Sequence, residues 1–503
     1  MTEKKTGAQA PDEGDVLESY SFNAGGMPVD IKIVRKEEFV PHYVMAIPGL
    51  GQGTKILLST LKGELITDVK LEVSEIVDPK KAEGVRKKFE EKSLSLLKRH
   101  FPTTSEETRQ VLSSYLIQNT LGLGDLEPPM YDDALEEIVI NGSHDPVWVY
   151  HKRHGWCKTN ILLPDDESVY EYASVIGRKV GRQINSLDPL MDAHLPSGDR
   201  VNATLFPISS FGNTLTIRKF SKNPWTIPNL IKAKSLTSET AALIWLCIEN
   251  ELSFLVAGGT GSGKTSFLNA VSCLFPPTQR IVSIEDTREL TLPSFLQWIA
   301  MSTREPNAEG KGEITMLDLM INTLRMRPDR IVVGEIRRQR EAEVLFEAMH
   351  TGHSVYATLH ADNAEEAISR LTNPPLNVPV NMLSSLSAIV VQYRHRRLGV
   401  RRTLEFAEVQ RTGEVSILQR WDPKSDKLRE LNPMSALSDT LALYSGLSPK
   451  EIKKDVTEKA SIFEWAVRHN LDDVNTVGMV TGLYYEDPGY VLDMVKKNVP
   501  LKA

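Results

Sequence analysis

Residues 252–271 read LSFLVAGGTGSGKTSFLNAV and place the pattern G-x-x-x-x-G-K-[ST] between an apolar run and a helix-forming run. Glycines in this pattern let backbone N–H groups wrap phosphate oxygens, and the helix start adds positive potential. Lys264 can then reach the β- and γ-phosphates, and the Thr265 hydroxyl can hold Mg²⁺. The strand-loop-helix context favours a phosphate loop over a chance glycine-rich turn. The candidate nucleotide-binding residues are Gly258, Gly259, Thr260, Gly261, Ser262, Gly263, Lys264 and Thr265.

Three further apolar runs end in polar groups in the same way. These runs are RIVSIED (280–286), which ends in Glu285 and Asp286, DRIVVGE (329–335), which ends in Glu335, and SVYATLH (354–360), which ends in His360. Alternating strand-like and helical stretches from about residue 238 indicate a parallel sheet covered by helices. Ligands of such open sheets bind beyond the carboxyl ends of the strands. If the four strands are neighbours, the loop, the carboxylates and the histidine converge.

Each of these polar groups has a chemical role to play at a phosphate site. Glu335 can order Mg²⁺ through water or polarise the attacking water. Glu285 can share in water activation, and Asp286 can hold metal-bound water or merely cap the turn that follows. His360 would face the γ-phosphate, where a neutral imidazole can donate to phosphate oxygen or water. Solvated strand-end acids and a simply packed histidine are the alternative interpretations.

Two other histidines, His350 and His353, have the spacing of possible transition-metal ligands. They lie in the stretch HTGH, in which Gly352 is typical of a residue that follows a helix, and histidines there favour the helix dipole. We therefore predict a helix C-terminus at this point rather than a metal site.

Composition bounds the class of protein. The chain has 503 residues, which is too long for one core, and a net charge of -7, which gives no sign of a nucleic-acid-coating surface. Cys157, Cys247 and Cys273 lie far apart, so no disulfide framework or cysteine zinc site is supported and the cell interior is expected. No apolar run reaches the roughly 20 residues of a membrane span.

The pattern along the chain predicts six segments. They are a disordered tail at 1–15, a small N-terminal module with helices at 16–123, an α+β domain at 124–220, a proline-containing linker at 221–237, an α/β domain at 238–434 and a helical tail at 435–503. In the small module, the runs VDIKIV (29–34), HYVMAIPG (42–49) and ITDVKLEV (66–73) predict short strands.

Four motifs in this order resemble the type II/type IV secretion superfamily of hexameric ATPases. AGGTGSGKT, IEDTREL, LRMRPDRIVVGEIR and GHSVYATLHADNAEEAISRL are similar to its phosphate loop, aspartate box, Walker B and histidine box. The similarity covers about Tyr115 to the C-terminus and is strongest to the archaeal branch, which contains pilus and secretion ATPases and the archaellum motor. The resemblance implies an α/β fold: a RecA-like phosphate-loop domain with a preceding α+β domain, a small N-terminal module and a helical C-terminal tail.

The resemblance also implies roles for particular residues. Glu335 would be the principal catalytic carboxylate, with Glu285 and Asp286 in support and His360 on the γ-phosphate. LPSGDRVNAT and FGNTLTIRKF resemble the branch's arginine motifs, so Arg200 and Arg218 would reach the nucleotide from the N-terminal domain; strand-surface solubility is the alternative. Arg325, Arg327 and Arg337 flank the Walker B strand and can contact phosphate or the neighbouring subunit, or form structural ion pairs.

The chain departs from bacterial type II members because no four-cysteine module follows the histidine box. In its place the basic run RHRRLGVRR (394–402) predicts a hairpin with its turn at Leu398 and Gly399 and a solvated basic face. By charge alone this run would also suit nucleic acid or lipid.

The function expected from the family is an Mg²⁺-dependent ATPase that forms a homo-hexamer. It would act in the cytoplasm at the inner face of the membrane, through an integral membrane platform protein, to drive a pilus, a secretion pseudopilus or an archaellum. No nucleic-acid partner is expected. A RecA-like nucleic-acid translocase and a nucleotide-gated scaffold with little turnover are the alternative functions.

Overall fold

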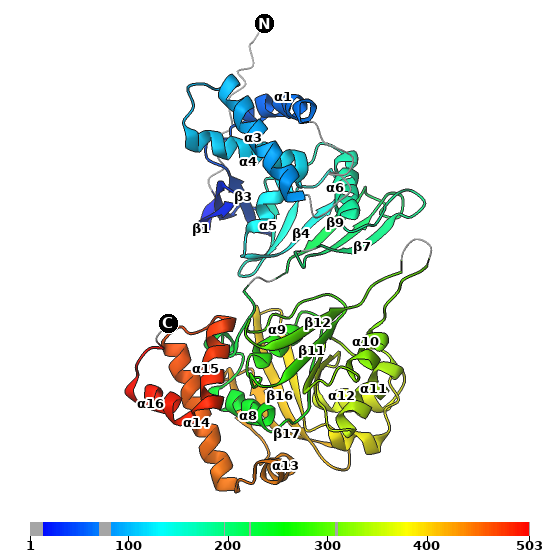
Figure 1. The fold of residues 1–503 in the computed structure, drawn as a ribbon, viewed down its shortest axis with the longest axis vertical. Coiled ribbons are helices and arrows are strands. Elements are labelled where there is room, and N and C mark those ends of the chain that lie inside the picture. The colour runs from blue at the N-terminus through cyan, green and yellow to red at the C-terminus, as the bar shows by residue number, and fades with distance from the viewer. Residues whose placement is uncertain (1–13, 70–81, 196, 221–222, 307–309, 502–503) are drawn as a thin grey trace. The chain divides into compact units, whose positions relative to one another are not determined.

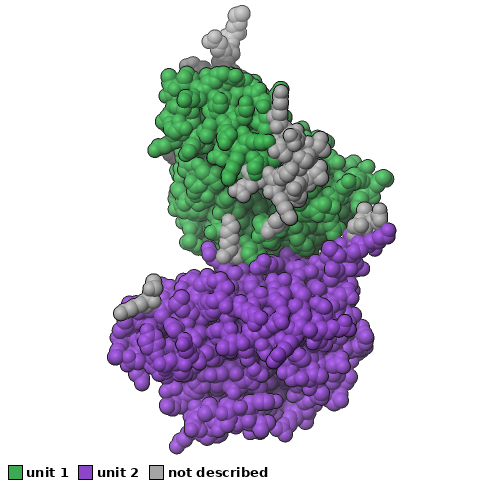
Figure 2. Space-filling model, in the orientation of Figure 1, with its two compact units in different colours: residues 1–221 green, residues 222–503 purple. Residues whose placement is uncertain are grey.

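The computed structural model describes residues 14–69, 82–195, 197–220, 223–306 and 310–501. The chain forms two compact units, residues 1–221 and 222–503, which are coloured separately in Figure 2. Each unit is built around its own nine-stranded sheet. In the described part of the chain, every helix is too short or too polar to cross a lipid bilayer.

The first unit has the strand order β1-β2-β3-β6-β5-β4-β9-β8-β7. Its pairs are antiparallel except for the parallel pair β3 and β6. Its elements are β1 (Asp15–Ala24), β2 (Met27–Arg35), β3 (His42–Ala46), α1 (Gln52–Asp68), α3 (Ala82–His100), α4 (Glu106–Leu121), the 3-10 helix η2 (Gly124–Leu126), α5 (Glu127–Tyr131), β4 (Leu135–Asn141), β5 (Trp148–His151), β6 (Gly155–Thr159), α6 (Asp166–Lys179), β7 (Leu190–His194), β8 (Arg200–Thr204) and β9 (Thr214–Arg218).

One sheet therefore runs through the small N-terminal module and the α+β region. Strand β2 of the small module has the sequence MPVDIKIVR, in which buried and exposed side chains largely alternate, as a half-buried strand requires. Residues 1–13 of the expected tail lie outside the described part of the chain. Asp15, the last residue of that expected tail, begins β1. The prediction of a strand at 66–73 is wrong for residues 66–68, which form the end of helix α1. The buried residues Leu58, Leu61 and Leu65 follow a helical period. Residues 70–73 lie outside the described part.

The second unit has the strand order β12-β11-β13-β14-β10-β15-β16-β17-β18. Its elements are α7 (Ile227–Lys232), α8 (Ser238–Glu249), β10 (Phe254–Gly258), α9 (Lys264–Ser272), β11 (Arg280–Glu285), β12 (Gln297–Ser302), α10 (Met316–Thr323), β13 (Arg330–Val333), α11 (Gln339–His350), β14 (Ser354–Leu359), α12 (Ala364–Thr372), the 3-10 helix η3 (Val380–Ser385), β15 (Ala388–His395), β16 (Val400–Val409), β17 (Val415–Asp422), β18 (Lys427–Glu430), α13 (Ala436–Ser445), α14 (Pro449–Arg468), α15 (Val474–Glu486) and α16 (Pro488–Lys497).

Helices cover both faces of this second sheet (Figure 1). Strand β10 is buried on both sides, since Phe254 and Val256 join one hydrophobic cluster and Leu255 and Ala257 join the other. Such doubly covered strands are continuous apolar runs rather than alternating ones. From β12 through β11, β13, β14 and β10 to β15, each strand is parallel to the next, and the strands from β15 to β18 pair antiparallel. The predicted α/β fold class is confirmed.

Part of the expected linker is folded into the second unit. Residues 227–232 form helix α7, which begins at a capping box between Thr226 and Asn229 and has Pro228 in its first turn. Ile227 and Leu230 are buried in the core. Proline therefore marks a helix start here, which is its favoured place within a helix.

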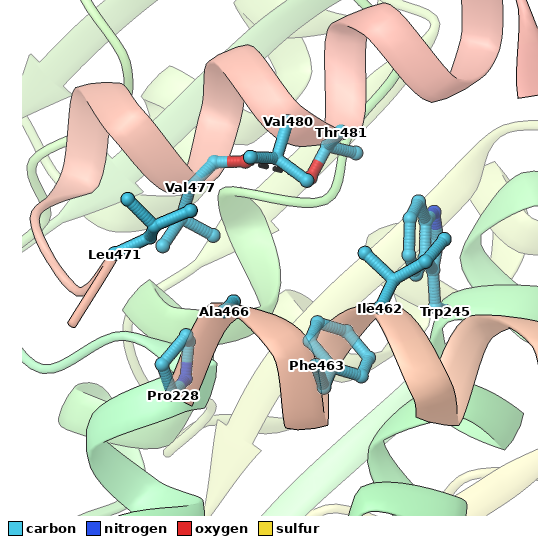
Figure 3. A pocket seen from close by; sticks show the side chains of 9 residues that line it. All are labelled: Pro228, Trp245, Ile462, Phe463, Ala466, Leu471, Val477, Val480 and Thr481. Carbon is cyan, nitrogen blue, oxygen red and sulfur yellow. Dashed lines mark hydrogen bonds between the residues drawn. The ribbon is translucent and has the colours of Figure 1, made fainter. Parts of the chain in front are cut away.

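The C-terminal helices share the core of the α/β domain. Trp245 of α8 packs against Phe463 of α14 and Tyr484 of α15, with ring centroids 5.3 and 4.8 Å apart. An apolar crevice remains between α14 and α15 (Figure 3), where the Thr481 hydroxyl points to the Val477 carbonyl and donates to it at 2.9 Å. Because the Thr481 hydroxyl is bonded within its own helix, we interpret this crevice as a gap in core packing.

Candidate active site

The four strands with polar ends are consecutive in the second sheet, as β11, β13, β14 and β10. Because they are parallel, their carboxyl ends meet at one edge, which carries Glu285, Glu335, His360 and the phosphate loop. The four strands are thus the neighbours that the predicted convergence requires.

The phosphate loop leaves β10 and enters α9 with glycines where side chains would not fit. Gly261 and Gly263 have φ of +70° and +98°, the left-handed region that favours glycine. A Cβ atom on Gly258 would lie 2.3 Å from the Gln392 carbonyl oxygen of β15. The loop is thus seated against the neighbouring strand, with the N-terminus of α9 at its end.

Lys264 is the first residue of α9 and lies half-buried under the loop. Its ammonium donates to the carbonyl oxygens of Gly258 at 2.8 Å and Gly259 at 3.2 Å. Burial lowers the pKa of Lys264, and the Glu335 carboxylate opposes that shift. Thr265 follows it in the first turn of α9, beside the backbone N–H groups of the helix start.

Arg337 joins two of the carboxylates. It donates from Nη2 to Glu335 Oε2 at 2.7 Å and from Nη1 to Asp286 Oδ2 at 2.7 Å. Of the interpretations of Arg337, the structure shows the ion pair. The Arg337 guanidinium therefore bridges Glu335 and Asp286 and holds them close together. These two acids follow β13 and β11, respectively.

His360 faces the phosphate loop. Its Nε2 atom lies 3.2 Å from the Thr260 hydroxyl, and the ring is half-buried at the end of β14. Asp362, which sequence reasoning did not single out, also approaches the loop, since a Cβ atom on Gly259 would lie 3.2 Å from its Oδ1 atom. The signal for Asp362 was its place two residues after His360.

Glu285 differs from the other acids because it is 2% exposed. Its Oε1 atom accepts the backbone N–H groups of Glu289 at 2.9 Å and Leu290 at 3.1 Å, and its Oε2 atom has no hydrogen-bond partner among the described residues. Burial raises the pKa of Glu285 from its ordinary value of 4.5 to about 7. A carboxyl of this pKa can take up a proton near neutral pH, as shared water activation requires.

Arg200 and Arg218 lie in the first unit, directly opposite each other on β8 and β9. Arg200 donates from Nη2 to Asp192 Oδ2 at 2.7 Å. Both side chains are exposed. Their expected part in nucleotide contact remains a prediction.

His350 and His353 lie at the end of α11, as predicted. Gly352 has φ of +95°, and the backbone N–H of His353 donates to the Ala348 carbonyl oxygen at 3.0 Å, which closes the helix.

A different histidine cluster lies in the first unit, where ligand atoms of Glu18, His151 and His154 are all within 4.8 Å of one another. The His151 Nδ1 atom accepts backbone N–H groups from Arg153 and His154 at 3.2 Å each. A neutral ring with Nδ1 as acceptor carries its proton on Nε2, so that nitrogen is a donor and not a metal ligand. We assign no metal to this cluster.

The basic run 394–402 forms the predicted hairpin, with His395 paired to Val400 across the turn. Its basic side chains are not all on a solvated face, however. Arg401 donates from Nε to the Gly261 carbonyl oxygen of the phosphate loop at 3.1 Å. Arg402 is buried and pairs with Asp426 at 2.7 Å. The expectation of a solvated basic face is wrong for these two residues. The pairing of β15 with β10 brings Arg401 to the loop, and Arg402 pairs with Asp426 in the turn between β17 and β18.

Residues 123–425 match the family model described as Type II/IV secretion system protein. The chain belongs to this family. As a member, it is 33% identical over 392 residues to the uncharacterized protein MJ0900 of Methanocaldococcus jannaschii, covering 76% of this chain and 70% of that protein. It is 31% identical over 269 residues to the type IV secretion system protein PtlH of Bordetella pertussis, covering 49% and 78%. Among solved structures it is similar to the Legionella pneumophila ATPase DotB, with a TM-score of 0.41 and 17% identity, covering 76% of this chain and 96% of that chain.

Proposed function

We propose that this member of the type II/IV secretion family hydrolyses ATP and couples the reaction to mechanical work on a membrane-anchored filament or secretion machine. The observation that carries the proposal is the convergence of the phosphate loop, the Glu335–Arg337–Asp286 cluster and His360 at one sheet edge. Family membership and the name of the relative PtlH support the secretion context.

Each residue of the edge has a task in water attack on the γ-phosphate. The loop N–H groups and Lys264 hold the phosphates, and Glu335 orients the attacking water. Glu285 shares in taking up the water proton through its free oxygen. His360 contacts the γ-phosphate and, through its neighbour Thr260, senses whether that phosphate is present.

The oxygen donors of this edge suit Mg²⁺, which prefers hydroxyl, carboxylate and water ligands. Thr265 would hold the ion directly, and Asp286, fixed by Arg337 at 2.7 Å, would hold it through water. When bound, Mg²⁺ supplies charge neutralisation on the phosphate oxygens.

The motor would be a homo-hexamer in the cytoplasm, peripheral to the membrane and in contact with an integral platform protein. Arg200 and Arg218 would complete the site from an N-terminal domain, their own or a neighbour's. Arginines that act in this way contribute on the order of 10³-fold or more to phosphoryl transfer. Domain closure on ATP and opening after hydrolysis would produce the stroke.

The test is ATP hydrolysis by the purified chain, with and without Mg²⁺, anionic lipid vesicles and single-stranded DNA, beside Glu335→Gln. We expect slow Mg²⁺-dependent turnover that lipid raises, that DNA leaves unchanged, and that Glu335→Gln lowers by about 10²-fold or more. Strong stimulation by DNA would move the protein to the translocase class. Turnover unaffected by Glu335→Gln would overturn the assignment of the catalytic carboxylate.

A further inference from the structure

The hairpin of β15 and β16 sets two arginines beside the phosphate loop. Strand β15 is the parallel neighbour of β10, with Gln392 in register with Gly258. Two residues further along β15, Arg394 stands directly opposite Arg401 of β16. The pair therefore lies just beyond the point where β10 becomes the loop.

Both arginines contact or closely approach that loop. Arg401 donates from Nε to the Gly261 carbonyl oxygen at 3.1 Å. A Cβ atom on Gly261 would lie 3.2 Å from Nη1 of Arg394, and one on Gly263 would lie 3.5 Å from Cδ of Arg401. The two side chains are half-buried. The Nε bond orients the Arg401 guanidinium on the loop.

The charge of this arrangement points to an anionic ligand. Arg394 and Arg401 bring two guanidiniums to a loop whose glycine pattern and helix start are those of a phosphate site. A guanidinium presents a planar fork of donors that matches phosphate geometry, and it stays charged at any physiological pH.

The sheet order decides which phosphates are in reach. Counting outward from β10, the strands β14, β13 and β11 lie on one side. We call this side the hydrolytic flank; it carries His360, Glu335, Arg337, Glu285 and Asp286. Strands β15 and β16 lie on the other side and carry Arg394 and Arg401, here called the arginine flank. The reacting γ-phosphate belongs on the hydrolytic flank, so the arginine flank is left for the phosphates that are not transferred.

We propose that Arg394 and Arg401 bind the diphosphate group that ATP and ADP share, and so set nucleotide affinity rather than the rate of hydrolysis. The proposal rests on the proposed function for the identity of the nucleotide. It gives part of the basic run a role at the phosphate loop, in place of a role with nucleic acid or lipid.

Other arginines of the same hairpin provide matched controls. Arg396 and Arg397 lie in the turn and are exposed. They carry the same charge a few residues away from the loop. Substitution of Arg396 or Arg397 by Gln therefore changes the net charge equally without touching the loop.

The experiment measures ADP affinity of the full chain by calorimetry for the wild type and for the variants Arg394→Gln, Arg401→Gln, Arg394→Lys and Arg396→Gln. Inorganic pyrophosphate is then used as a competitor of ADP. Loss of one charge-assisted hydrogen bond should raise the ADP dissociation constant about 10-fold in each Gln variant at the loop. The pyrophosphate constant should rise by a similar factor, since the contact is to phosphate. Arg394→Lys should recover part of the affinity, and Arg396→Gln should leave it within about 2-fold.

Steady-state kinetics separate this role from a structural one. The loop variants should raise KM for ATP by the same factor as the ADP constant and leave kcat within about 3-fold. Thermal midpoints without nucleotide serve to show that the variants fold. Unchanged ADP and pyrophosphate affinity in Arg394→Gln and Arg401→Gln would overturn the inference, as would a fall in kcat alone. If the wild type binds ADP with this arginine dependence yet does not hydrolyse ATP, the proposed function fails and the inference stands.

Discussion

The two flanks of the phosphate loop differ in the charge of their side chains. The hydrolytic flank gathers carboxylates from separate parallel strands and holds two of them with one guanidinium, Arg337. The arginine flank presents two guanidiniums, those of Arg394 and Arg401, on adjacent antiparallel strands. An acid-rich flank can position water and Mg²⁺, whereas a cationic flank can only hold anions. Under the proposed function, chemistry and nucleotide retention are assigned to separate strands of one sheet.

Dependence on pH gives one way to sharpen this comparison, because the hydrolytic flank contains Glu285, a buried acid with a raised pKa. Burial holds the pKa of Glu285 at about 7, above its ordinary value of 4.5, so its stabilising contribution is complete below about pH 4.5 and is lost as pH rises through 7. Glu285→Gln, which mimics the protonated acid, should remove a fall of about 3 kcal/mol in unfolding free energy between these values.

Urea unfolding of the nucleotide-free chain at several pH values checks this expectation. Glu464→Gln, on the exposed face of α14, is the matched control and should leave the pH slope of the wild type in place. An equal slope in the wild type and Glu285→Gln would contradict the buried, proton-holding role of Glu285.

Removal of the guanidinium from the hydrolytic flank should have a smaller effect. Arg337→Ala leaves Glu335 and Asp286 without the side chain that fixes them, so kcat should fall about 10-fold, which corresponds to about 1.4 kcal/mol. The ADP dissociation constant should change by less than about 2-fold. Arg340→Ala, which removes an exposed ion pair with Glu343 on α11, is the control for loss of one arginine. If Arg337→Ala weakened ADP as much as it slowed turnover, the two flanks would not be separable.

The hydrolytic flank could be predicted from the sequence, and the arginine flank could not. Glu335 and His360 each follow a short apolar run, and the ends of parallel strands share one edge, so the local pattern predicts their convergence once the strands are neighbours. The hairpin at 394–402 was also visible as a local feature. Its position depends on the pairing of Gln392 with Gly258, which joins distant segments and leaves no local signal.

Other differences between sequence and structure have the same origin. The prolines of residues 221–237 predict a linker, although proline is also favoured in the first turn of a helix, where Pro228 lies in α7. The polar composition of residues 1–15 places Asp15 in the predicted tail, whereas its pairing with Arg35 of β2 makes it the first residue of β1. In each case a contact made elsewhere in the chain decided the local structure.

The most direct test of the division between the flanks combines one substitution from each. Turnover and ADP affinity would be measured for Glu335→Gln, Arg394→Gln and the double variant. The structure predicts that Glu335→Gln lowers kcat and leaves ADP affinity within about 2-fold, that Arg394→Gln does the reverse, and that the two effects add to within about 0.5 kcal/mol. A loss of ADP affinity in Glu335→Gln as large as that in Arg394→Gln, or strong non-additivity in the double variant, would show that the two flanks act as one unit and contradict the account.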